Sequence, residues 1–188
     1  MIRYLIRGTA IAAGVVAVPL ALVMSASADT IWGDNHIGNQ AGAPTGVGAP
    51  FGFTTSLTGQ DPAARVVYRT VSGDIEELAS SGGSWSAVDL TALTGAPSAV
   101  GIAFGYTTTL TDQGPTARVV YRTTGRHIVE LALPSGGSWQ ADDLTAASGA
   151  PDAASAPFGY TTSLTGQVPA ARVVYRAAGR DIEELSTG

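Results

Sequence analysis

The chain repeats one sequence three times, and this repeat limits the folds it can adopt more than any other feature. The ten residues that begin at Phe51 recur with few changes from Phe104 and from Phe158. Each copy is followed by Ala-Arg-Val-Val-Tyr-Arg, and the first arginines of these hexapeptides are Arg65, Arg118 and Arg172. Successive copies are therefore 53 and 54 residues apart. A period of this length is typical of arrays in which similar supersecondary units bury their faces against one another.

Each repeat has the pattern of four short strands. In the middle copy, β-branched and aromatic residues are frequent in 104–110, 117–122 is a short apolar segment, 127–133 alternates in polarity, and 139–144 is a fourth, weaker strand. Clusters of Gly, Pro, Ser, Thr and Asp separate these segments, and no segment has helical periodicity of useful length. The sequence therefore predicts an all-β fold, a β-propeller built from three four-stranded blades per chain.

The chain enters and leaves the repeat out of phase. Trp32 occupies the position that Trp85 and Trp139 occupy in later copies, so residue 29 onward corresponds to a fourth strand. The last segment, 182–185, corresponds to a third strand. Pairing the two chain ends removes exposed sheet edges and suits a closed ring. Because propellers typically have four to eight blades, we expect a homo-oligomer, with a dimer of six blades favoured and the N-terminal strand closing a blade of the partner.

The first 28 residues have the features of a secretory signal peptide. Arg3 and Arg7 precede an apolar run over 10–24, and Ala26-Ser27-Ala28 forms a cleavage signature. A membrane anchor is the alternative, but the run is shorter than the about 20 residues that a span needs. We predict cleavage near Ala28, a secreted protein with no membrane contact after cleavage, and a repeat domain over 29–188. Its repeats are approximately 51–103, 104–157, and 158–188 together with 29–50.

Composition excludes several classes of partner. The segment 29–188 has 8 arginines, no lysine and 15 acidic residues, a formal net charge of −7. Such a surface has no electrostatic footprint for nucleic acid or anionic lipid. Cysteine is absent, so neither disulfides nor thiol chemistry are available. His36 and His127 lie in different repeats and make a poor metal site, so we expect no metal and no cofactor.

An arginine and a glutamate recur twelve residues apart in every copy. Counting outward from a turn at residue 124 places Arg118 opposite Glu130, with side chains on one face and about 5 Å between β-carbons. The same arithmetic gives two further pairs, Arg65 with Glu77 and Arg172 with Glu184. One interpretation is an ion pair that fixes strand register. The other is a polar clamp for a hydroxylated ligand, because guanidinium donors and carboxylate acceptors can satisfy adjacent sugar hydroxyls.

A tryptophan follows the third strand of each unit. Trp85 and Trp139 come after Gly-Gly-Ser, and Trp32 is their phase equivalent. An indole can stack on the apolar face of a pyranose while Arg and Glu bind its hydroxyls. Equally, these rings can simply cover the outer part of each blade.

The strings Arg118-Val-Val-Tyr-Arg, Ile128-Val-Glu130-Leu and Gly137-Ser-Trp139 resemble the blades of the six-bladed fucose-binding lectins of fungi and soil bacteria. The resemblance covers essentially all of 29–188. It implies a ligand between adjacent blades, held by an arginine on the second strand, a glutamate on the third and a tryptophan from the neighbouring blade. It also implies assembly of short chains into six blades. The implied carbohydrate-binding residues are Arg65, Arg118, Arg172, Glu77, Glu130, Glu184, Trp32, Trp85 and Trp139.

Two other classes remain open. A glycoside-acting enzyme needs paired carboxylates flanking one bond, and Asp142 and Asp143 are strand neighbours that point to opposite faces. No nucleophile elbow, zinc motif or phosphate loop is present in the sequence. The remaining alternative is an exported structural or interaction propeller without a small ligand. We therefore expect a lectin without catalysis that binds fucosylated glycans.

Overall fold

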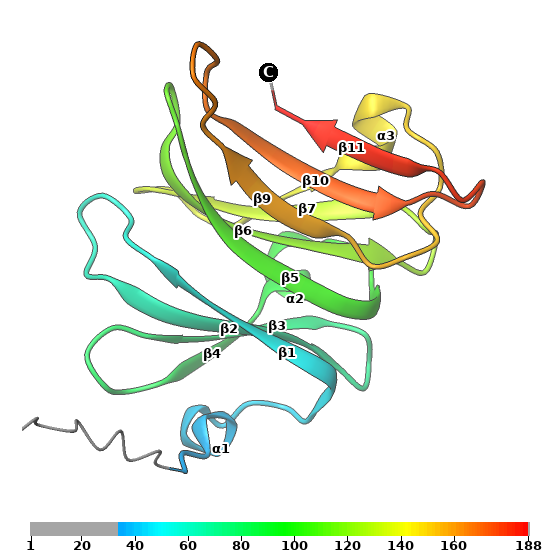
Figure 1. Ribbon diagram of the computed structural model, residues 1–188. Helices are drawn as coiled ribbons and strands as arrows, with labels where there is room; N and C mark the ends of the chain where they lie inside the picture. Colours follow the sequence, from blue (N-terminus) through cyan, green and yellow to red (C-terminus); the bar gives the residue numbers. More distant parts are fainter. Residues whose placement is uncertain (1–33, 188) are drawn as a thin grey trace, which may run out of the picture. The chain divides into compact units, whose positions relative to one another are not determined.

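The computed structural model describes residues 34–187, and these residues form three antiparallel sheets, each a meander in chain order (Figure 1). Blade 1 contains β1 (Gly46–Thr55), β2 (Ala63–Thr70), β3 (Ile75–Ser80) and β4 (Ser86–Asp89). Blade 2 contains β5 (Ala99–Leu110), β6 (Gly114–Thr123), β7 (Ile128–Pro134) and β8 (Gln140–Asp143). Blade 3 contains β9 (Phe158–Thr162), β10 (Ala170–Arg176) and β11 (Ile182–Ser186). The expectation of an all-β chain with one antiparallel sheet per repeat is confirmed.

The turn between the second and third strand of each blade sets a register that differs from the predicted one. In blade 2, Thr123 pairs with His127 across a three-residue loop centred on residue 125, not 124. Arg118 therefore lies opposite Ala132, and Glu130 lies opposite Val120. The predicted direct opposition is wrong by two residues, in this blade and in the other two. The arginine and glutamate are diagonal neighbours on one face, which long side chains can still bridge.

The fourth strands β4 and β8 lead into one-turn helices that were not predicted from the sequence, α2 (Leu90–Thr94) and α3 (Leu144–Ser148). A third one-turn helix, α1 (Ile37–Ala41), precedes β1. Asp89 and Asp143 cap α2 and α3 by accepting hydrogen bonds from the backbone N–H groups of Ala92 and Ala146. The repeated Asp-Leu-Thr was a signal for this turn, because aspartate is a preferred N-cap residue.

Adjacent blades meet at a glycine in the first strand of each. A β-carbon on Gly105 would lie 2.3 Å from the ring of Phe53, and one on Gly159 would lie 2.2 Å from the ring of Tyr106. Only glycine lets the aromatic ring of the preceding blade lie this close to the strand. The equivalent residue of blade 1, Gly52, is exposed and has no ring against it among the described residues.

Hydrophobic clusters lie between the blades, and two of them are the larger cores. The first joins Val67 and Ile75 of blade 1 to Val119 and Leu131 of blade 2. The second joins blade 2 to blade 3 through Val120, Ile128, Val173 and Tyr175. Phenylalanines of the three first strands also stack, with ring centroids 3.9 and 4.0 Å apart. Blades 1 and 2 therefore each present their Arg/Glu face to the next blade in the chain.

Some predictions fall on residues that the structure does not describe. The signal peptide at 1–28, Trp32 and the beginning of the N-terminal strand all lie outside residues 34–187. The helix α1 begins 53 residues before α2, which is the spacing of the repeat. None of the helices in the described part is long and apolar enough to cross a membrane.

Candidate functional site

All three predicted Arg/Glu pairs form. Arg65 donates from Nη1 to Oε1 of Glu77 at 2.5 Å. The other two pairs make the same short contact, between Arg118 and Glu130 and between Arg172 and Glu184. In each blade the arginine lies on the second strand and the glutamate on the third strand, so the same pair geometry recurs in all three blades.

A threonine holds each arginine from the other side. The Nε–H of Arg118 donates to Thr108 Oγ1 at 2.9 Å, and Thr55 and Thr162 accept the same bond from Arg65 and Arg172. These threonines were not among the residues predicted from the sequence. Their signal was the Thr-Thr doublet that recurs in every copy of the first strand. Each arginine is thus oriented by a hydroxyl at Nε and by a carboxylate at Nη1.

The glutamates have different third partners. The Tyr106 hydroxyl donates to Glu130 at 2.8 Å, and the Tyr160 hydroxyl donates to Glu184 at 2.6 Å. Blade 1 has Phe53 at this position, which has no hydroxyl. There the indole of Trp139, from blade 2, lies close enough to Glu77 to favour its ionised form. The structure therefore brings one predicted tryptophan to one predicted pair, across a blade boundary.

The two tryptophans within the described residues, Trp85 and Trp139, differ in their surroundings. Trp85 is half-buried just before β4 and lies in none of the hydrophobic clusters that the described residues form. Trp139 packs against Phe53, Leu57, Ala117 and Leu133, which places it between blades 1 and 2.

Burial separates the pairs into two kinds. The side chains of the first two pairs are at most 7% exposed, whereas Arg172 is 22% and Glu184 is 39% exposed. Burial raises the pKa of Glu77 and of Glu130 above its ordinary value, against the opposing effect of the paired arginines. In contrast, the hydrogen bond from Tyr160, together with Arg172, lowers the pKa of Glu184.

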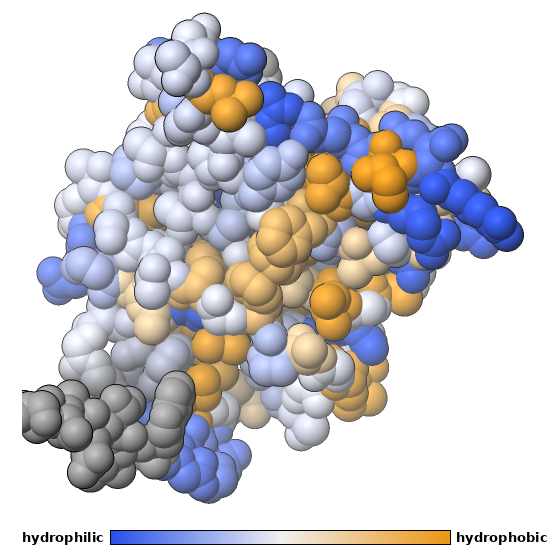
Figure 2. All heavy atoms as spheres, viewed as in Figure 1, coloured by the Kyte–Doolittle hydropathy of each residue, from blue (hydrophilic) through white to orange (hydrophobic). Residues whose placement is uncertain are grey.

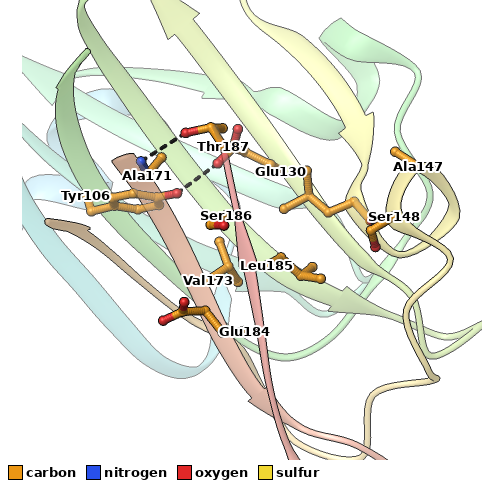
Figure 3. Close-up of a pocket in the computed structure, with 11 residues that line it drawn as sticks. Tyr106, Glu130, Ala147, Ser148, Ala171, Val173, Glu184, Leu185, Ser186 and Thr187 are labelled. Carbon is orange, nitrogen blue, oxygen red and sulfur yellow. Dashed lines mark hydrogen bonds between the residues drawn. The ribbon is translucent and has the colours of Figure 1, made fainter. Parts of the chain in front are cut away.

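Two hollows reach these residues. A polar depression of about 320 Å³ borders Arg65, and serines of β3, β4 and the turn between them line its other side. A larger cavity of about 420 Å³ lies between blades 2 and 3 (Figure 3). In Figure 3, Tyr106 and Glu130 point into it from blade 2, and Val173 and Leu185 border it from blade 3. The first two pairs are thus buried but adjoin hollows of sugar size.

Other titratable groups make no second site. His127 Nδ1 lies 2.6 Å from Asp143 on the surface, and this carboxylate raises the pKa of His127. Within residues 34–187, no group of three or more His, Cys, Asp or Glu side chains is arranged to hold a metal ion.

Solved structures with a similar fold include propeller lectins. The chain superposes on a fucose lectin of Kordia zhangzhouensis, solved with methyl-fucoside, with a TM-score of 0.55 and 19% identity. That match covers 74% of this chain and 92% of the lectin. The six-bladed Aleuria aurantia lectin gives a TM-score of 0.50 at 17% identity, over 74% of this chain. AofleA of Arthrobotrys oligospora gives 0.51 at 14% identity, over 78% of this chain.

The chain therefore has the β-propeller fold of the fucose lectins. It spans 45% and 42% of the two fungal proteins, so it contains part of a ring of that size. No protein-family model matches the sequence, and no curated protein matches it.

Proposed function

We propose that this protein is a secreted lectin that binds fucose, or a similar sugar, at the boundaries between blades and performs no catalysis. The observation that carries the proposal is the first pair, where Arg65 and Glu77 of blade 1 meet Trp139 of blade 2. A guanidinium, a carboxylate and an indole lie close together there, in a fold shared with fucose lectins.

The chemistry of this boundary suits a monosaccharide. Arg65 lines the polar depression, whose lining residues all belong to blade 1, so a ligand that enters it meets the guanidinium. The serines opposite it supply further hydroxyl partners. Charge-assisted hydrogen bonds to sugar hydroxyls are roughly twice as strong as neutral ones, and an indole supplies flat apolar area.

The decisive experiment replaces all three arginines by lysine. The triple variant Arg65→Lys/Arg118→Lys/Arg172→Lys keeps the charge opposite each glutamate but loses the bidentate fork. We expect it to keep its circular dichroism spectrum and to lose at least ten-fold in affinity for fucosylated glycans, measured on a glycan array and by titration with methyl-fucoside.

A matched control uses two arginines outside the pairs. Arg126 and Arg180 are exposed in the equivalent hairpin turns, so Arg126→Lys/Arg180→Lys should bind as the unaltered protein does. Equal binding by the triple variant and this control would overturn the clamp. Turnover of a chromogenic glycoside that survives the triple substitution would favour an enzyme instead.

A second candidate is an exported structural or interaction propeller with no small ligand. The observation that favours it is the second pair, where Arg118 already donates to Thr108, Glu130 and Gln113. A guanidinium with these partners is well satisfied without a ligand. This candidate predicts that no sugar on the array binds, while the triple lysine variant still loses stability.

Secretion is tested by the N-terminus of the exported protein. Expression from the complete coding sequence should yield a chain outside the cell that begins at Asp29, as determined by intact mass. A chain that retains residues 1–28 and stays with the membrane would support the anchor instead.

A further inference from the structure

The paired arginines of blades 1 and 2 differ in one contact. Arg118 donates from Nη2 to the side-chain Oε1 of Gln113 at 3.0 Å, in addition to its bonds to a threonine and a glutamate. Within residues 34–187, Arg65 has the equivalents of those other two bonds but no bond to Gln60, which has the position of Gln113. The guanidinium of Arg118 is therefore occupied at all three nitrogens, and that of Arg65 at two.

The sequence difference lies in the turn that precedes each arginine. Blade 1 has Gly59-Gln60-Asp61 there, and blade 2 has the reverse order, Asp112-Gln113-Gly114. Blade 3 has Gly166-Gln167-Val168 and so keeps the glycine where blade 1 has it. The glutamine is common to the three blades, whereas the place of the glycine beside it is not.

A glycine before the glutamine gives one kind of turn. The backbone N–H of Gln60 donates to the carbonyl of Leu57 at 3.1 Å, and Gly59, the third residue of this turn, has a φ of 77°. A positive φ at the third residue is the mark of a type II turn. Gly166 has a φ of 79° at the equivalent position, so blades 1 and 3 share this geometry.

A glycine after the glutamine gives a different turn. Asp112 does not have a positive φ, whereas Gly114 has a φ of 65°. A type I turn followed by a left-handed residue closes a three-residue hairpin loop. The ladder of β5 and β6 therefore continues to the pair Leu110 and Gly114, two pairs beyond the equivalent end of the β1 and β2 ladder. In Figure 1 this hairpin runs unbroken into a tight turn, whereas a wider loop joins β1 to β2.

The residue after β7 holds this turn in place. Ser135 donates to the carbonyl of Pro115 from both its backbone N–H and its Oγ, at 3.0 and 2.8 Å. Its Oγ also accepts a hydrogen bond from the backbone N–H of Thr58 in blade 1. In the described part of blade 1, the equivalent Ser81 makes no such bonds. The turn that carries Gln113 is thus tied both to its own blade and to the preceding one.

We propose that Gln113 masks Arg118 by occupying its guanidinium in the place of a ligand, and that the order of glycine and aspartate around the glutamine decides whether the arginine of a blade is available. An amide oxygen accepts from a guanidinium as a sugar hydroxyl does. Blade 1 then has an open site and blade 2 a closed one, although their Arg/Glu pairs are alike. This inference rests on the lectin proposal and deepens it by naming the residue that regulates the second site.

Access to the two arginines agrees with this assignment. Arg65 lines the polar depression of blade 1, whereas Arg118 lines neither of the two hollows. The cavity between blades 2 and 3 reaches Glu130, the partner of Arg118, but not the arginine itself. A ligand at Arg118 must replace an existing bond, whereas a ligand at Arg65 gains one. Hydrogen bonds to charged groups are strong enough for this exchange to change affinity about ten-fold.

The turns can be exchanged without touching a hydrophobic core. Figure 2 shows hydrophobic residues gathered over β5 and β9, and mainly neutral or hydrophilic residues over the β1–β2 loop and the β5–β6 turn. Gly59, Asp61, Asp112 and Gln113 are exposed. The variant Asp112→Gly/Gly114→Asp gives blade 2 the residues of blade 1, and Gly59→Asp/Asp61→Gly makes the reverse exchange. Both variants keep the composition of the chain.

The first measurement needs no sugar. NMR follows hydrogen exchange of the guanidinium groups in full chains that contain isotope-labelled arginine, and Arg65→Lys and Arg118→Lys assign the signals. We expect the Nη2 protons of Arg118 to exchange at least ten-fold more slowly than those of Arg65. Gln113→Ala should remove this difference. Gln167→Ala is the matched control, because Gln167 is exposed in the equivalent turn of blade 3 and has no bond to the paired arginine among the described residues.

The second measurement titrates the same chains with methyl-fucoside. Gln113→Ala and Asp112→Gly/Gly114→Asp should each add one site per chain, because they free Arg118. Gly59→Asp/Asp61→Gly should remove one site, because Gln60 then masks Arg65. The control Gln167→Ala should bind as the unaltered protein does. Gln113→Ala alone decides if an exchanged turn fails to fold, since it only shortens an exposed side chain.

Three results would overturn the inference. One is equal exchange at Arg65 and Arg118 in the unaltered protein. Another is a loss of sugar binding in Gln113→Ala, because Gln113 then orients Arg118 for the ligand instead of masking it. The third is an unchanged number of sites in Gln113→Ala when the unaltered protein binds methyl-fucoside. If the exchange rates change as expected and no chain binds sugar, the lectin proposal fails while the contact between Gln113 and Arg118 stands.

Discussion

The boundary between blades 1 and 2 and the outer face of blade 3 are built from the same residues in different surroundings. At the first, Glu77 is buried and lies beside Trp139. At the second, Glu184 is 39% exposed, and its hydrogen-bond partners among the described residues, Tyr160 and Arg172, belong to its own blade. The burial and the partners of each glutamate therefore depend on the neighbouring blade, because the residues of the pair itself are the same. Four paired comparisons test how equivalent positions of different blades respond to the same change.

The largest difference is expected between Arg118→Ala and Arg172→Ala. Removing Arg118 leaves Glu130 buried without its cation, which typically costs about 3–5 kcal/mol of unfolding free energy. Removing Arg172 breaks a more exposed pair, for which about 1 kcal/mol or less is typical. Urea unfolding followed by tryptophan fluorescence measures both. Equal losses would contradict the contrast, and a loss at Arg172 that grows with protein concentration would show that a second copy covers the third pair.

The next effect concerns the glycines of the first strands. A methyl group at Gly159 would collide with the Tyr106 ring, which its hydroxyl bond to Glu130 holds in place. Overpacking of this kind costs about 1–3 kcal/mol, so Gly159→Ala should lower the melting temperature by several degrees. Gly52→Ala is the matched control, because the nearest atom to its β-carbon is 3.9 Å away. If Gly159→Ala and Gly52→Ala have equal melting temperatures and both variants are monomeric, the packing difference between the two glycines is contradicted.

A smaller effect is the opposite titration of two glutamates. Burial raises the pKa of Glu130, so its ionisation weakens folding as the pH rises from the ordinary glutamate range through the raised value. The pKa of Glu184 is lowered, so its contribution is present above the ordinary range and is lost as the pH falls through the lowered value. Carbon-detected NMR titration of the side-chain carboxyls, assigned with Glu130→Gln and Glu184→Gln, measures both. Shifts in the same direction would show that the two surroundings do not differ.

The smallest effect is at the hairpin turns. Gly73 has a φ of 95°, and Arg126 has a φ of 68° at the equivalent position of blade 2. A left-handed conformation costs a non-glycine residue roughly 1 kcal/mol. Arg126→Gly should therefore stabilise the fold by about 0.5–1 kcal/mol, less the entropy that glycine adds to the unfolded chain. Gly73→Ala, the reverse exchange in blade 1, should destabilise it. Thermal unfolding of both variants decides, and a loss of stability in Arg126→Gly would contradict the argument.

The repeat made the sheets predictable, but not their register. Alternation and turn residues placed the strands close to the observed bounds, and the recurrence of Arg and Glu identified the pairs. The register was wrong because a three-residue loop with a left-handed third residue shifts the pairing by two, and Arg126 carries no glycine signal for it. The tyrosine and threonine partners were missed because their role depends on which side chains of the first strand lie on the same face of the sheet as the Arg/Glu pair.

The sequence by itself determined the blade: its strands, and its arginine and glutamate on one face. Those features are local, since they follow from side-chain alternation and from a fixed spacing along the chain. Only the tertiary structure decided which pairs are buried. It also decided that Trp139 lies near Glu77 of the preceding blade, and that a cavity between blades 2 and 3 borders Glu130. Such features arise between blades, where packing of residues distant in sequence sets burial and charge.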